Sequence, residues 1–93
     1  MEFESSQGKI IRHTDALKKV LVNKNIAYGN SALQGVKVFS KLTSVEALCC
    51  RLDDKLGRIK NSGINDETED TLMDVAGYII LLQIALENER NND

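Results

Sequence analysis

The segment at residues 66–86 constrains the fold of this 93-residue chain most strongly, because a row of acids there runs into an apolar helix. Asp66 followed by Glu69 forms a capping box, which predicts that a helix begins at this point. Residues 75–86 are apolar on almost every side. A helix that is apolar all round is buried all round, so in so short a chain other subunits are expected to supply part of the burial.

Composition predicts one small globular domain made of helices. Apolar residues make up 42% and charged residues 28% of the chain, which excludes a disordered class, and proline is absent. The net charge of -2 argues against binding in a DNA or RNA groove but leaves room for a nucleotide site, which needs only a few cations. No signal peptide or membrane-spanning segment is visible, so we expect a cytoplasmic protein with no membrane partner.

The N-terminal third is predicted to form a flexible arm at residues 1–9 and then the first helix. This helix would begin at Ile10 or Thr14, with Thr14 as a candidate N-cap, and end at Asn25. One face of this helix is apolar and has a lysine at its C-terminal end. The residues of this face are Leu17, Val20, Leu21 and Lys24, and Ile10 and His13 extend it toward the N-terminus.

Capping signals also predict the second and third helices. Ser31 would cap a helix over residues 32–41, and Thr43 with Glu46 forms a capping box for a helix that runs to Asn61. A stripe of apolar side chains on the third helix is expected to be buried. Its members are Val45, Leu48, Cys49, Leu52, Leu56 and Ile59.

The fourth helix is expected to end near Glu87, which leaves residues 88–93 as a frayed tail and residues 10–87 as one helical domain. The short turn after Gly63 makes the third and fourth helices antiparallel neighbours. The predicted architecture is therefore an all-α, four-helix bundle that oligomerises, with the fourth helix at its centre.

The two cysteines, Cys49 and Cys50, are adjacent within a helical pattern. Their side chains diverge by ~100°, so a disulfide between them would distort the helix. Free thiols indicate a reducing compartment. We interpret both as small apolar core residues, because their spacing matches no zinc motif.

The third and fourth predicted helices together could gather carboxylates into a metal site. At ~100° per residue, Glu67, Asp70 and Asp74 share one face of the fourth helix with Tyr78. Asp54 of the third helix would oppose Asp70 and Asp74, with Glu67 at the rim. Carboxylates that converge in this way suit Mg²⁺.

Cations beside this acidic face could hold phosphate oxygens. Arg58 offers a planar fork and Lys55 a point charge, and Arg51 lies on the same helix face. Tyr28, at a corner beside a helix N-terminus, could also meet an anion. An equally weighted alternative is a set of salt bridges between two amphipathic helices, with Arg51, Lys55 and Arg58 against Asp70 and Asp74.

Three segments resemble the motifs of a known family. Residues 24–31 match a K-x-x-x-Y-G-[ND]-[SA] corner, residues 51–58 an R-L-x-D-K-x-x-R helix, and residues 70–78 a D-T-L-x-D-x-x-x-Y helix. These are similar to the motifs of the nucleotide modification associated domain family of small phage and bacterial proteins. The resemblance extends over residues 15–86, and it places the protein in the host cytoplasm if the chain is phage-encoded.

That family resembles in turn the MazG-like all-α nucleoside triphosphate pyrophosphatases, which oligomerise and use Mg²⁺. The resemblance implies a nucleotide ligand, with Asp54, Asp70 and Asp74 at Mg²⁺. Lys55, Arg58 and Arg51 would then contact the nucleotide, together with Tyr28, Asn30 and Tyr78.

The third helix lacks the E-x-x-E metal motif of those pyrophosphatases. Hydrolysis is therefore one hypothesis, in which metal-bound water attacks a phosphoryl group and pyrophosphate leaves. A second is a non-catalytic module, either a sponge for a nucleotide signal or an inhibitor of a host protein partner. A third is a purely structural oligomer.

Overall fold

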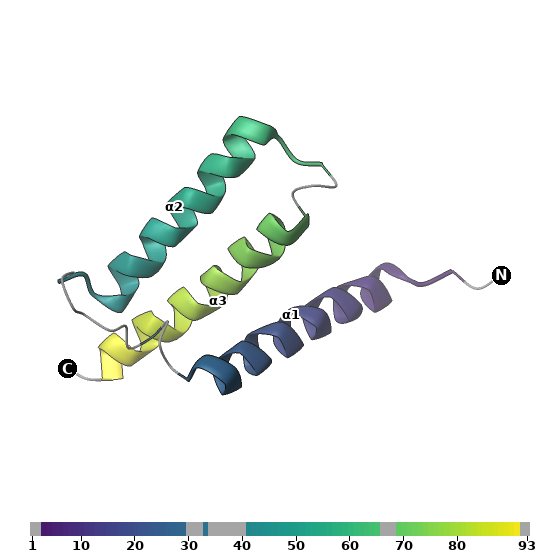
Figure 1. Ribbon diagram of the computed structural model, residues 1–93. Coiled ribbons are helices and arrows are strands. Elements are labelled where there is room, and N and C mark those ends of the chain that lie inside the picture. Colours follow the sequence, from purple (N-terminus) through teal and green to yellow (C-terminus); the bar gives the residue numbers. More distant parts are fainter. Residues whose placement is uncertain (1–2, 30–32, 34–40, 66–68, 92–93) are drawn as a thin grey trace.

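The computed structural model describes residues 3–29, 33, 41–65 and 69–91, which form three helices and no strand (Figure 1). These are α1 (Ser6–Tyr28), α2 (Ser44–Ser62) and α3 (Glu69–Asn91). The all-α class is thus confirmed. The described residues hold three helices where the sequence predicted four. Of the predicted helix at residues 32–41, residues 32 and 34–40 lie outside the described part of the chain.

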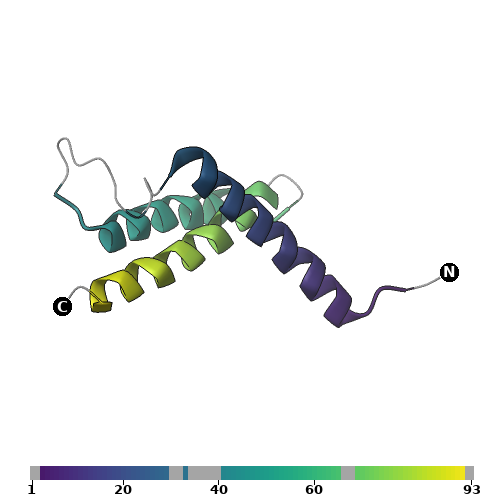
Figure 2. The same ribbon diagram turned by 90° about the horizontal axis from the view of Figure 1, so that it is seen from below.

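The three helices form an antiparallel pair with a third helix laid across it. α2 and α3 run side by side in opposite directions, as the short turn after Gly63 predicted (Figure 1). α1 crosses this pair obliquely, and its N-terminal half projects beyond the other two helices (Figure 2). α3 packs against both α1 and α2, so it holds the central place that was predicted for the fourth helix.

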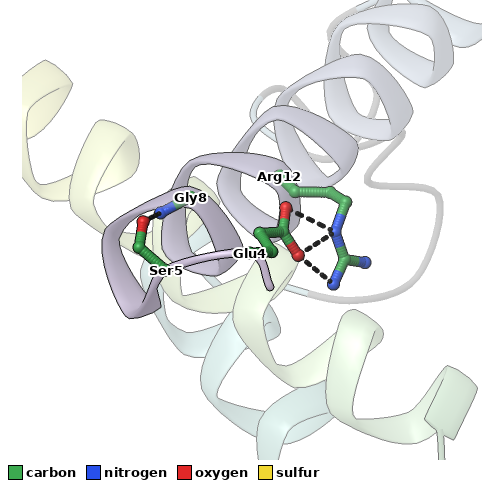
Figure 3. Close-up of polar contacts among 4 residues, drawn as sticks. All are labelled: Glu4, Ser5, Gly8 and Arg12. Atoms are coloured by element: carbon green, nitrogen blue, oxygen red, sulfur yellow. Dashed lines mark hydrogen bonds and ion pairs between the residues drawn. The ribbon is translucent and has the colours of Figure 1, made fainter. Parts of the chain in front are cut away.

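α1 begins earlier than the sequence predicted. Ser5 is its N-cap, and the Ser5 hydroxyl accepts a hydrogen bond of 3.0 Å from the backbone N–H of Gly8 (Figure 3). The guanidinium of Arg12 also forms an ion pair with the carboxylate of Glu4, with an N–O distance of 3.1 Å. Residues 6–9 therefore belong to the helix and not to an arm that precedes it.

Thr14 was a candidate N-cap for a helix that would begin at Ile10 or Thr14, and both starts are wrong. The Thr14 hydroxyl donates to the carbonyls of Ile10 and Ile11, at 2.8 and 3.0 Å, which is how threonine bonds back onto the preceding turn inside a helix. The sequence signal failed because Ser5 has no acid or glutamine three residues on, so no capping box marked the real start. The helix continues past the predicted end to Tyr28, and Gly29 follows at φ 64°.

α2 closely matches its predicted bounds. The Thr43 hydroxyl accepts from the backbone N–H of Glu46 at 3.1 Å, and the N–H of Gly63 donates to the carbonyl of Ile59 at 2.8 Å. Gly63 takes φ 74°, a value that L-residues with a side chain avoid. The N-cap at Thr43 and the terminal glycine are both confirmed.

The sequence predicted more buried residues on α2 than the structure buries. Leu48 is buried, but Leu56 is half exposed and Cys49 and Cys50 are exposed free thiols, so they are not core residues. The reason is geometric: among the described helices α2 packs extensively only on α3, and a single helix covers only the arc centred on Leu48.

α3 extends to Asn91, beyond the predicted end near Glu87. The residues after Glu87 include Glu89 and Arg90, which favour helix, and neither glycine nor proline interrupts them. None of the helices that the structure describes combines the length and the apolar character needed to cross a membrane.

α1 comes close to α3 at Gly77. An ideal Cβ built on this buried glycine would lie 3.1 Å from a methyl carbon of Leu21 and 4.0 Å from one of Leu17. The missing side chain therefore lets the two helices approach at their crossing point. Gly57 of α2, in contrast, would place a Cβ in open space.

These two glycines give a matched test of the crossing. Alanine at Gly57 should raise the free energy of unfolding by about 0.5–1 kcal/mol, since it improves helix propensity without meeting a neighbour. Alanine at Gly77 should give a clearly smaller gain or a loss, because Leu21 must move. Urea unfolding followed by circular dichroism measures both, and equal gains would contradict the close crossing.

Candidate binding site

A cavity of ≈ 210 Å³ opens where α1 crosses the α2–α3 pair, and we call it the inter-helix cavity. All three helices contribute to its wall. Its apolar surface comes from α1, α3 and the connection after α1; these residues are Leu17, Val20, Leu21, Leu33, Met73 and Leu81. Gly77 also lines it, so the close approach of α1 to α3 helps to shape the cavity.

Two cations line this cavity from different helices. Lys24 lies near the end of α1 and Arg51 in the first half of α2, and both side chains belong to exposed residues. The ion pairs formed by the described residues include neither Lys24 nor Arg51. Their charges are therefore available to a ligand at the mouth of the inter-helix cavity.

Asp74 is the carboxylate in the cavity wall, and its charge is already balanced. Its Oδ2 lies 3.0 Å from the Nζ of Lys55, across the α2–α3 interface. The exposed fractions of the two side chains are 17% for Lys55 and 32% for Asp74, so water screens this pair only in part. With Asp74 neutralised in this way, the described part of the wall has a net positive charge from Lys24 and Arg51.

The predicted salt-bridge alternative is therefore confirmed for one pair, Lys55 with Asp74. Of the other predicted site residues on these helices, Asp54, Arg58 and Asp70 are exposed, and none of the three lines the inter-helix cavity. Glu67 and Asn30 lie outside the described residues, and Tyr28 is described only as the last residue of α1.

The structure brings together a subset of the predicted site. Arg51, Asp74 and Tyr78 all line the inter-helix cavity, with Tyr78 half-buried. Within residues 3–29, 33, 41–65 and 69–91, no group of three or more acids, histidines or cysteines is placed to hold a metal ion. The Mg²⁺ site built on Asp54, Asp70, Asp74 and Glu67 stays a prediction.

Sequence reasoning did not assign Lys24 and Asn25 to the site, although both line the inter-helix cavity. The amide of Asn25 donates to the carbonyl of Gly29 at 3.1 Å, which ties the end of α1 to the turn beside the cavity. The sequence did contain a signal for Lys24 as a site residue, because Lys24 is the first residue of the first of the three motifs. Its side chain had been interpreted only as part of the helix face.

A second hollow, of ≈ 580 Å³, lies between α1 and α3 beyond Leu21. Its wall is almost wholly apolar and contains Val22, Ile80 and Ile84, with Lys18 as its one charged residue. Such a wall has few polar groups that could fix the orientation of a polar ligand. We therefore place the candidate site in the smaller cavity, where cations from two helices meet.

Comparisons of this chain with protein-family models, with curated proteins and with solved structures found no match.

The half-buried ion pair should contribute more to stability than an exposed one. In a double-mutant cycle, Lys55→Met and Asp74→Asn should show a coupling free energy of about 0.5–3 kcal/mol. Lys18 and Asp15 form the matched control, because they lie 3.7 Å apart with side chains 74% and 63% exposed. Their coupling should stay at or below about 0.5 kcal/mol. Denaturant unfolding measures both cycles, and equal couplings would show that the Lys55–Asp74 pair is not shielded from water.

Proposed function

We propose that this protein binds a small anionic ligand in the inter-helix cavity, and that the ligand is a nucleotide. The observation that carries the proposal is the meeting of Lys24 and Arg51, from two different helices, over an apolar wall. A nucleotide combines phosphate oxygens with a flat base, and this wall offers a partner for each. The proposed role is binding without hydrolysis.

The three segments that resemble motifs of the nucleotide modification associated domain family support a nucleotide as the ligand. Each segment supplies residues to the same cavity, although the segments are far apart in the sequence. Residues 24–31 supply Lys24, residues 51–58 supply Arg51, and residues 70–78 supply Asp74 and Tyr78. Motifs that converge on one cavity are expected of a ligand site and not of helix packing alone.

Charge and size suggest how such a ligand would lie. Arg51 can bind two phosphate oxygens with its planar fork, and the flexible stem of Lys24 lets its ammonium follow a phosphate. A volume of ≈ 210 Å³ is below the range of roughly 300–1,000 Å³ that is usual for small-molecule sites. The base would therefore enter beside Tyr78 and Met73, and the phosphates would stay at the exposed rim.

The described carboxylates do not fit a metal held by the protein alone. Asp74 is engaged by Lys55 at 3.0 Å, and Asp54 and Asp70 are exposed and belong to no metal-binding group among the described residues. We therefore derive no hydrolytic step, and Mg²⁺ enters only as a variable in the test. This arrangement favours the hypothesis of a non-catalytic sponge for a nucleotide signal over the pyrophosphatase hypothesis.

We also propose that the protein is a homo-oligomer, because one chain leaves too much surface exposed. Its accessible surface is 7610 Å², whereas a compact monomer of 10.3 kDa exposes about 5,400 Å². The radius of gyration is 15.7 Å, against about 12 Å for a compact chain of this length. Among the described residues, Leu48 and Ala85 are the only buried hydrophobic side chains.

Thermal melting with and without ligand tests the binding proposal. Nucleoside mono-, di- and triphosphates and cyclic nucleotides should be screened, each with and without Mg²⁺. We expect at least one to raise the melting temperature without metal, and a ligand at 100 times its Kd should add about 2.7 kcal/mol to the free energy of unfolding. The absence of any shift would contradict the proposal, and a shift that requires both triphosphate and Mg²⁺ would favour the hydrolase.

Charge-removing variants locate the bound ligand. Arg51→Gln and Lys24→Gln should each weaken binding by about 10-fold or more, since each removes a charge-assisted hydrogen bond of about 1.5–3 kcal/mol. Arg58→Gln and Lys60→Gln are the matched controls, because both cations are exposed on α2 and neither lines the cavity. Calorimetric titration measures all four, and equal losses at all four positions would indicate nonspecific charge attraction instead of a site.

A further inference from the structure

The outward face of α3 has apolar residues at a regular interval. Leu72, Ile79 and Leu86 are seven residues apart, and their exposed fractions are 44%, 45% and 45%. At ~100° per residue the three lie within about 40° of one another, so they form one line along the helix. We call them the outer stripe.

Neither of the other two described helices covers the outer stripe. Seen down the α3 axis, Ile79 lies about 160° from Gly77, which meets α1, and about 140° from Asp74, which meets α2. Both contacts therefore lie on the part of α3 that faces away from Ile79. Val75 and Leu82 are half-buried beside the stripe, and they complete the alternating spacing of three and four residues that lets one helix pack along another.

We propose that the outer stripe is the contact surface for a second copy of this chain, with the two α3 helices packed antiparallel about a two-fold axis at Ile79. This inference rests on the proposed self-association and assigns a surface to it. The two-fold pairs Ile79 with its own copy and Leu72 with Leu86 of the partner subunit, because both leucines are seven residues from Ile79.

The exposed surface of the whole chain is large enough for self-association. The chain exposes roughly 2,200 Å² more than a compact monomer of its mass, and a stable dimer needs about 800 Å² from each partner. Half-exposed leucine and isoleucine side chains are the kind of surface that forms the core of a dimer interface.

Charge favours the antiparallel register over the parallel one. Arg90 is exposed and lies in line with the outer stripe, eighteen residues after Leu72. In the antiparallel register the two copies of Arg90 lie about 33 Å apart along the helices, since each is eleven residues from Ile79. In the parallel register Arg90 would face its own copy, and like charges side by side are destabilising.

Sedimentation equilibrium at micromolar concentration tests the surface. We expect the wild-type chain to have the mass of a dimer and Ile79→Glu to have the mass of a monomer with unchanged helical circular dichroism. Leu56→Glu is the matched control, because Leu56 is 50% exposed on α2, and it should stay dimeric. A monomeric wild type would overturn both the self-association and the surface, whereas a dimeric Ile79→Glu would overturn only the surface.

Cross-linking tests the register without a variant that adds charge to the interface. In a Cys49→Ser, Cys50→Ser background, chains with Leu72→Cys are mixed with chains with Leu86→Cys and treated with a short bismaleimide. The two positions are about 21 Å apart along one helix, so a short reagent distinguishes the registers. We expect mixed dimers to cross-link and Leu72→Cys alone to stay uncross-linked; the reverse result would overturn the antiparallel register.

Discussion

One constraint governs this structure: α3 has apolar side chains on three sides, and the described part of the chain packs two helices against it. α1 covers the side that contains Gly77, and α2 covers the side that contains Asp74. The hydrophobic effect acts on all three sides alike, so the third side, with Ile79 at its centre, is a surface that a partner can bury. Helix propensity and capping set where each helix lies in the sequence, whereas this burial requirement sets how the helices assemble.

The inter-helix cavity depends on the same helix. Because Gly77 has no side chain, α1 can cross α3 closely, and the crossing brings Lys24 toward Arg51 and Asp74. The Lys55–Asp74 pair then leaves the remaining charge of the wall positive. Ligand binding and self-association would thus use opposite sides of α3, and a change on one side need not disturb the other.

Local signals predicted part of this structure well. The capping box at Thr43 and Gly63 at the end of α2 determine their own backbone geometry, so sequence alone was enough for them. The start of α1 was missed because Ser5 caps it without the second residue of a capping box. The exposure of Cys49 and Leu56 depends on how many neighbours α2 has, which its own sequence does not state.

The candidate site shows the same division between local and long-range information. Arg51, Asp74 and Tyr78 were predicted as site residues and do line one cavity, but Asp74 pairs with Lys55 and not with other carboxylates. Lys24 joins them because of the α1 crossing, a contact between helices far apart in the sequence.

Native-state hydrogen exchange tests the central role of α3 most directly. We expect the amides of residues 73–85 to be the most protected, with protection that rises with protein concentration, and those of residues 6–14 to exchange fastest within the helices. Equal protection of α1 and α3, independent of concentration, would contradict it.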